Sequence, residues 1–252
     1  MARQKGILKL EGTIAEYTFY KTAKGYFARE KGGVSSARIA NDPNFRRTRE
    51  NCSEFGRAGK AGKLFRTTFR ELSVHSSDSS ISNRLTKLML KVIQADATNV
   101  RGQRNVIDGE AELLKNFEFN NLSQLNTTLL APYTVTMNRV TGIMEIAFNS
   151  FIPETMIKAP EGATHYKLQT AGAAIDFENE DYEIDIATSN EQIINAVNTA
   201  PITLTTNVTA ATTRPLFMLL GIEFFQEVNG KMYPLKNGNF NALKVIEVNG
   251  GV

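Results

Sequence analysis

The chain has 252 residues, enough for one large domain or two ordinary ones, and its 42% hydrophobic and 22% charged content is typical of a globular protein. Cys52 is the only cysteine, which excludes an internal disulfide and a multi-cysteine zinc site. No apolar run of about 18 residues predicts a membrane span. No apolar segment follows the basic first residues, so we expect cytoplasmic synthesis without a signal peptide, with a phage-like or extracellular assembly left open.

Charge is divided unevenly along the chain. Residues 1–110 hold 21 of the 29 Lys and Arg residues but 11 of the 26 Asp and Glu residues, a net charge of +10. Residues 111–252 hold 8 basic and 15 acidic residues, a net charge of −7. Such a charge asymmetry gives information about the binding partners of a protein rather than about its fold. It indicates either contact between unlike halves of neighbouring copies or binding of a polyanion by the basic half.

Residues 6–31 are predicted to form a β-hairpin. Ile7–Leu10 is the first expected strand, Thr13–Tyr20 alternates as a second, and Tyr26–Arg29 returns after the turn at Lys24-Gly25. An isolated hairpin is marginally stable in water, so this aromatic-rich one must dock on something.

Two helices should follow. Residues 42–72 begin with the capping residue Asp42 and with Pro43, and residues 77–96 carry a strong apolar stripe. One face of the first helix should be apolar or small and buried, with Phe45, Cys52, Phe55, Gly59, Gly62, Phe65 and Phe69 at three- to four-residue spacing. The glycines Gly56, Gly59 and Gly62 either break the helix or allow another backbone to approach closely, and the sequence does not favour one of these interpretations over the other.

After about residue 116 the chain is rich in Thr, Asn, Val and Ile in short alternating runs. We therefore predict an α+β fold with two parts, a basic hairpin–helix module at residues 1–115 and an antiparallel β-sandwich of immunoglobulin-like or fibronectin-like character at residues 116–252. The predicted strands are Pro132–Asn138, Gly142–Asn149, His165–Thr170, Tyr182–Ala187, Ile202–Val208, Phe217–Glu227, Met232–Pro234 and Leu243–Val248.

Catalytic arrangements are hard to build from this sequence. His75 and His165 are far apart and lack metal-ligand spacing, and Cys52 has no nearby base. The glycines around Lys63 do not match a phosphate-binding loop. We predict a non-enzymatic protein without cofactor or metal.

Three groups of residues are the candidate contacts. They are basic residues on the first helix, aromatic residues of the hairpin and carboxylates around residue 180, for which a solvated or electrostatic role is favoured over Ca²⁺ binding. The residues are Arg46, Arg47, Arg57, Lys60, Lys63, Arg66 and Arg70; Tyr17, Phe19 and Tyr26; and Asp176, Glu178, Glu183 and Asp185.

The N-terminal quarter contains Gly6-Ile7-Leu8, Ala28-Arg29-Glu30-Lys31-Gly32-Gly33 and Asn41-Asp42-Pro43. These motifs resemble the N-termini of a group of uncharacterised proteins common in Bacteroidota. The resemblance implies a bacterial source and assigns no activity or site residue.

The sequence supports two functional hypotheses. The first is a structural protein that self-assembles into a filament, tube or shell, the basic module of one copy meeting the acidic sandwich of the next. The alternative is a nucleic-acid-binding protein that uses the basic helices at residues 42–104.

Overall fold

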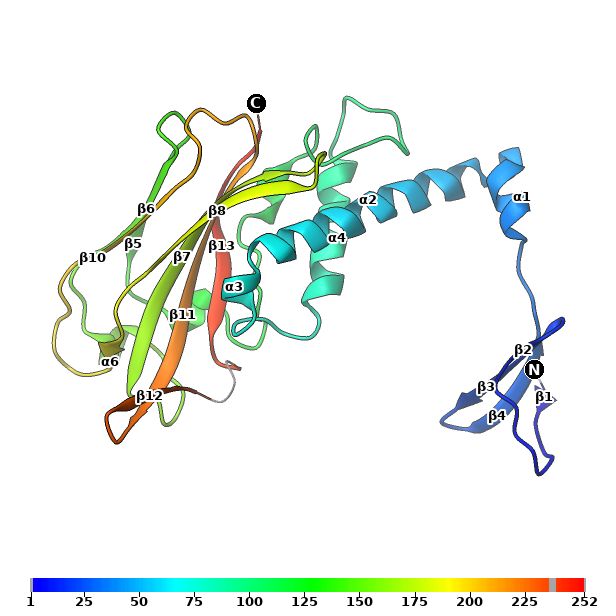
Figure 1. Ribbon diagram of the computed structural model, residues 1–252, viewed down its shortest axis with the longest axis horizontal. Coiled ribbons are helices and arrows are strands. Elements are labelled where there is room, and N and C mark those ends of the chain that lie inside the picture. The colour runs from blue at the N-terminus through cyan, green and yellow to red at the C-terminus, as the bar shows by residue number, and fades with distance from the viewer. Residues whose placement is uncertain (1, 236–238, 252) are drawn as a thin grey trace. The chain divides into compact units, whose positions relative to one another are not determined.

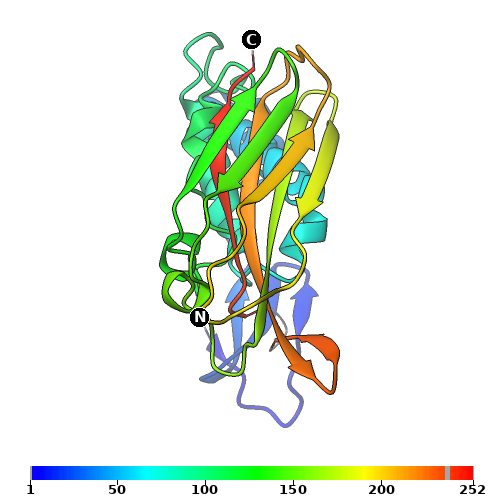
Figure 2. The ribbon, with the colours of Figure 1, turned by 90° about the vertical axis from the view of Figure 1, so that its left-hand side faces the viewer.

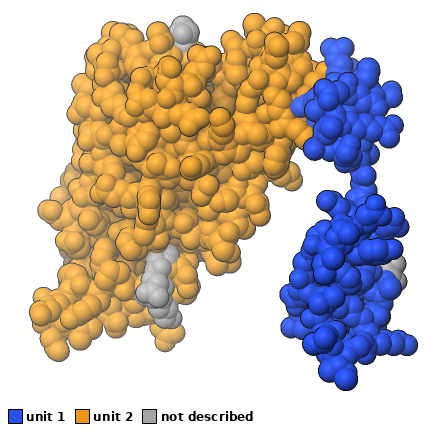
Figure 3. Space-filling model, turned by 45° about the vertical axis from the view of Figure 1, so that its right-hand side comes forward, with its two compact units in different colours: residues 1–49 blue, residues 50–252 orange. Residues whose placement is uncertain are grey.

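The computed structural model describes residues 2–235 and 239–251, and it divides into two compact units, residues 1–49 and residues 50–252 (Figure 3). Helices, antiparallel strands and a β-sandwich coexist in the chain, which confirms the predicted α+β fold class. No helix in these described ranges combines the length and apolarity needed to cross a lipid bilayer.

The first unit is a small antiparallel sheet followed by short helices. Its strands pair in the order β1-β4-β3-β2. A tight turn at Ala15-Glu16 splits the predicted strand Thr13–Tyr20, because Ala15 adopts a positive φ of 50°. The elements are β1 (Ala2–Arg3), β2 (Gly12–Ile14), β3 (Tyr17–Thr22), β4 (Gly25–Glu30), α1 (Ser36–Asn41) and the 3-10 turn η1 (Pro43–Phe45).

A long helix, α2 (Arg46–Thr68), leads from the first unit into the second. The Asp42 carboxylate accepts a hydrogen bond from the backbone amide of Asn44, and Pro43 starts η1, as the capping signal predicts. The glycines do not break the helix. At Gly62 a Cβ would lie 3.6 Å from Leu85, so this glycine brings the next long helix close, whereas Gly56 and Gly59 face open space.

The second unit consists of three layers: a helical layer, a large sheet and a small sheet (Figures 1 and 2). The helical layer contains α2 from residue 50 onward, α3 (Arg70–Ser73), α4 (Ile81–Gln94) and the 3-10 turn η2 (Ala111–Leu114). The short helices α5 (Leu125–Thr128) and α6 (Pro153–Met156) follow.

The two sheets form the sandwich, and every pairing in them is antiparallel. The small sheet has the order β10-β6-β5 and the large sheet the order β12-β11-β7-β8, with β13 on β11 and β9 on β7. All eight predicted strands are present. The strands are β5 (Tyr133–Asn138), β6 (Ile143–Phe148), β7 (His165–Asp176), β8 (Asp181–Thr188), β9 (Gln192–Ile193), β10 (Ile202–Asn207), β11 (Leu216–Val228), β12 (Lys231–Pro234) and β13 (Ala242–Asn249).

The centre of the large sheet, in β7 and the first part of β11, is buried on both faces. In β11, Phe217 and Leu219 face the helices, whereas Met218 and Leu220 face the small sheet. Strands covered on both sides read as nearly continuous apolar runs, and residues 216–222 are such a run. The two sheets approach closely at Gly172, where a Cβ would lie 2.5 Å from the Thr206 hydroxyl oxygen.

The compact units do not follow the boundary predicted at residues 115 and 116. Phe65 of α2 packs edge to face against Phe217 of β11, with ring centroids 5.1 Å apart, and α4 contributes Leu85 and Met89 to the same core. The helices therefore share one hydrophobic core with the sheet, and the division falls at residue 50 instead. The charge split misplaced it because surface charge does not report which apolar faces pack together.

Candidate assembly and polyanion-contact surfaces

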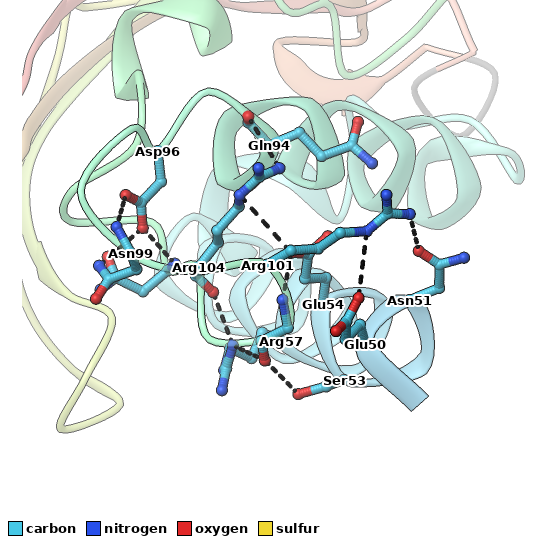
Figure 4. A network of polar contacts seen from close by, with 12 residues as sticks. Glu50, Asn51, Ser53, Glu54, Arg57, Gln94, Asp96, Asn99, Arg101 and Arg104 are labelled. Carbon is cyan, nitrogen blue, oxygen red and sulfur yellow. Dashed lines mark hydrogen bonds and ion pairs between the residues drawn. The ribbon is translucent and has the colours of Figure 1, made fainter. Parts of the chain in front are cut away.

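The basic side chains of α2 do not form one uniform surface. Arg57 donates from Nη1 to the carbonyl oxygens of Gly102 and Arg104, each at 2.8 Å, so its charge anchors the loop after α4 (Figure 4). The same loop is held by Glu54, whose Oε1 accepts the Gly102 amide at 2.8 Å. Arg57 is therefore a structural residue as well as a predicted contact.

Asp96 organises the other end of this loop (Figure 4). Its carboxylate accepts hydrogen bonds from the backbone amides of Thr98, Asn99 and Asn105 at 2.8–3.0 Å. Burial by itself would raise the pKa of Asp96, but these bonds, with the one from the Asn99 side chain, outweigh it and lower the pKa to about 2. A deprotonated Asp96 thus fixes the loop that Arg57 holds.

Lys60 faces the acidic turn of its own chain. Its Nζ lies 3.7 Å from Glu180 Oε1, and both side chains are well exposed. With Arg57 and Glu178 they line a hollow of about 330 Å³ between α2, residues 103–107 and the β7–β8 turn. Exposed pairs of this kind contribute little, about 0–1 kcal/mol. Still, the structure brings together within one copy groups that the sequence predicts to meet between copies.

The remaining basic residues divide into two groups. Lys63, Arg66 and Arg70 line a second hollow, of about 390 Å³, with α3 and the start of α4. Within the lining of this hollow, no carboxylate is present. Arg46 and Arg47 are exposed at the start of α2. Three of the predicted basic contacts therefore share one hollow whose lining holds no carboxylate.

Most of the predicted acidic contacts are used inside the chain. Asp176 accepts hydrogen bonds from the Asn179 side chain and from the backbone amides of Glu178 and Asn179, which lowers the pKa of Asp176. Arg214 lies 2.9 Å from Asp181 and 3.7 Å from Asp176. Asp176 thus shapes the β7–β8 turn.

Glu183 and Asp185 accept hydrogen bonds from main-chain amides at the end of β10 and just beyond it. The acceptors are Glu183 Oε2 at 3.0 Å from the Thr209 amide and Asp185 Oδ2 at 2.8 Å from the Asn207 amide. Of the four acidic residues predicted as contacts, Glu178 is the exposed one, and it lines the hollow of about 330 Å³ next to Lys60.

The aromatic contacts of the first unit share one face of its sheet. Tyr17 is opposite Ile14 in β2, and the β3–β4 register places Phe19 and Tyr26 on the same side. We call Ile14, Tyr17, Phe19 and Tyr26 the N-terminal apolar face. Tyr17 is 54% exposed, and Phe19 and Tyr26 are half-buried. The turn at Ala15 moves Ile14 to this face, opposite to the side that simple alternation predicts.

Sequence reasoning missed two features. The predicted strand Ile7–Leu10 is wrong: these residues form a loop, and Ile7 and Leu8 project into solvent. The predicted burial of Cys52 and Phe55 is also wrong, because both are exposed, whereas α2 buries Ala58, Ala61 and, as expected, Phe65. The sequence held one local sign of the loop: Ile7 and Leu8 are adjacent apolar residues, and adjacent residues of a strand point to opposite faces, so they cannot share one apolar face.

The two histidines and Cys52 lie outside any metal-holding cluster in the described residues. Within residues 2–235 and 239–251, no three His, Cys, Asp or Glu side chains gather to hold a metal ion. His165 Nδ1 lies 2.9 Å from the Thr164 hydroxyl, and Nε2 lies 3.8 Å from Glu227. Cys52 is exposed. The absence of a cofactor stays a prediction.

Comparison with known proteins adds little. No family model and no curated protein matches this chain. One solved structure, described as "pH-induced modulation of Streptococcus parasanguinis adhesion by Fap1 fimbriae", is similar over 52% of this chain and 88% of its own, at 11% identity and a TM-score of 0.24. A likeness this weak carries no argument, and the resemblance to Bacteroidota proteins stays a prediction.

Proposed function

We propose that this protein is a non-enzymatic structural protein that assembles with copies of itself into a filament, tube or shell, and that the N-terminal unit makes the contact. One observation carries the proposal. Residues 2–49 form a paired sheet with short helices, yet none of these described residues is buried. Small sheets need a hydrophobic face packed against something to be stable.

The apolar surface of this unit is suited to association. Ile7, Leu8, Ile14 and Tyr17 are all more than 40% exposed. Burying apolar surface stabilises a contact by about 25 cal/mol per Å². The association energy in this proposal comes mainly from the apolar side chains.

Charge then sets approach and register. Residues 1–49 hold 11 basic and 4 acidic residues, a net charge of +7, and residues 50–252 have a net charge of −4. Asp176, Glu183 and Asp185 already accept hydrogen bonds within the chain. Individual ion pairs with basic residues of a neighbour therefore contribute less to the association than the overall attraction between the oppositely charged units. A head-to-tail contact of unlike surfaces gives an open polymer unless its rotation closes. Such an assembly can act in the cytoplasm, in a phage-like particle or outside the cell.

The test is the native mass of the full chain at several concentrations in low and high salt, with negative-stain microscopy. We expect the mass to rise with concentration and ordered polymers to appear. Tyr17→Ser should weaken assembly, whereas Val140→Ser, at a 76% exposed valine of the sandwich, should not. A monomer under all of these conditions would overturn the proposal.

The hollow of Lys63, Arg66 and Arg70 favours nucleic-acid binding as the second candidate function. Clustered Lys and Arg bind phosphate backbones without a particular motif, and such binding weakens steeply with salt. A gel-shift assay with double- and single-stranded DNA tests it. Replacing all three residues with Gln should abolish retardation at low salt, and wild-type protein that causes no shift at low salt would remove this candidate.

A further inference from the structure

The loop between β1 and β2 presents two apolar side chains in an ordered frame. Gln4 binds the loop from one side: its side-chain oxygen accepts the Leu10 amide at 2.9 Å, and its nitrogen donates to the Leu10 and Phe27 carbonyls, each at 3.1 Å. Lys9 Nζ donates to the Gln4 and Gly6 carbonyls at 2.8 and 2.6 Å. Between these clamps Ile7 is fully exposed and Leu8 is 84% exposed.

The second unit has a partly apolar hollow next to Phe55, which we call the Phe55 hollow. It has a volume of about 630 Å³, and Cys52, Phe55, Gly56 and Leu90 supply its apolar lining from α2 and α4. Phe55 is 59% exposed although it belongs to a long helix of a packed layer. A Cβ on Gly56 would meet no atom within 4 Å, so the wall of the hollow is open to another chain.

Charges at the rim of the hollow are already neutralised. Arg101 Nε lies 3.8 Å from Glu50, and its Nη2 donates to Asn51 at 2.6 Å. Glu54, buried beneath the rim, accepts the Gly102 amide. The hollow therefore suits an apolar occupant better than a charged one.

We propose that the Ile7–Leu8 loop of one copy inserts into the Phe55 hollow of a second copy. This inference rests on the proposed self-assembly and names its contact. A pre-ordered loop loses little conformational entropy on docking, which favours its use as an anchor. The net charges of +7 on residues 1–49 and −4 on residues 50–252 favour the approach of unlike units of two copies.

Cys52 makes the contact directly measurable. Each copy has this single exposed thiol in the hollow, so a thiol at position 8 should find it. A disulfide needs Cα atoms about 4.4–6.8 Å apart. The experiment mixes wild-type protein with the full-length variant L8C/C52S under mild oxidation, and mass spectrometry distinguishes the mixed dimer from like pairs. We expect the mixed dimer to exceed like pairs at least about tenfold and to disappear on reduction.

Two further variants test the hollow itself. Phe55→Asp, introduced into the wild-type partner, should reduce the mixed dimer about tenfold or more, because it places a charge in an apolar contact. Val74→Asp is the matched control, since Val74 is also 59% exposed but lies outside the hollow. Equal effects of the two variants would overturn the proposal.

The remaining outcomes separate this contact from assembly in general. If the native mass of wild-type protein rises with concentration but the mixed dimer does not exceed like pairs, self-assembly stands and this contact is wrong. A single L8C variant that loses both thiols while it stays monomeric would show docking within one chain and overturn the second copy as occupant. A wild-type protein that never associates would overturn both this contact and the proposed function.

Discussion

The Oδ2 atom of Asp185 lies 2.8 Å from the backbone nitrogen of Asn207, so a carboxylate of β8 in the large sheet accepts a hydrogen bond from β10 at the edge of the small sheet. Glu183 accepts a hydrogen bond from the amide of Thr209, two residues beyond the end of β10. Unpaired amides at a sheet edge invite pairing with other chains, and natural proteins cover them. These carboxylates therefore cover the amides at the C-terminal end of the edge strand β10.

Removing both carboxylates should destabilise the fold. The variant E183A/D185A removes the carboxylates that accept the Asn207 and Thr209 amides, and we expect the free energy of unfolding to fall by about 2 kcal/mol. Urea denaturation measures it. Glu178→Ala is the control, because Glu178 is exposed on the rim of a hollow and should have little effect. A double variant of unchanged stability that loses self-association would instead restore these residues as contacts between copies.

Stability should depend on pH through Asp96. The folded-state pKa of Asp96 is lowered to about 2, below the usual value of 3.8, so its contribution is present above about pH 4 and is lost as the pH falls toward 2. At neutral pH, Asp96→Ala should cost about 1–3 kcal/mol because three backbone amides lose their acceptor.

Urea denaturation of wild type and Asp96→Ala from neutral pH down to about pH 2 measures this contribution. The difference between the two proteins should shrink as the pH falls below about 4. A difference that stays constant with pH would show that the ionised carboxylate is not the stabilising form.

Phe65 should couple the helices to the sandwich. Its ring packs against Phe69, Phe119 and Phe217 with centroids 5.0–6.2 Å apart, and its side chain is fully buried. Phe65→Ala should cost about 3–5 kcal/mol. Circular dichroism at a helix-sensitive and a strand-sensitive wavelength should show one coincident transition, before and after the substitution. Separate transitions for helices and strands would support the boundary at residues 115 and 116 that the sequence indicates.

The elements of this fold were readable wherever a local pattern decides them. The apolar stripe of residues 77–96 predicted α4, and the apolar run around Phe217 predicted β11. The buried face of α2 was readable in part: Phe65 is buried as expected, whereas Cys52 and Phe55 are exposed. The buried and exposed positions of α2 differ in partners that are distant in sequence. For example, the carboxylate of Glu54 accepts a hydrogen bond from the amide of Gly102, 48 residues later. Periodicity within one helix contains no information about such partners.

The candidate contacts show the same limit. The sequence groups Tyr17, Phe19 and Tyr26 as aromatic residues of one hairpin, and the β3–β4 register places them on a common face because strand pairing is local and regular. The sequence offers Glu183 and Asp185 as contacts, but it does not show that they bind the amides of Thr209 and Asn207, which lie more than 20 residues away in the chain. Charge patterning counts ionisable groups but does not show which of them the folded chain already uses.

Arg57 offers the clearest separation of a structural role from a contact role. Because Arg57 donates to the carbonyls of Gly102 and Arg104, Arg57→Gln should loosen the loop that follows α4 and cost about 1–3 kcal/mol. Hydrogen exchange of residues 101–105 should accelerate in the variant. Lys63→Gln removes a charge from the same helix without a hydrogen bond to this loop, so it serves as the control. If the two variants alter self-association or DNA binding equally while the exchange of the loop stays unchanged, the Arg57 charge acts on a partner rather than on its own chain.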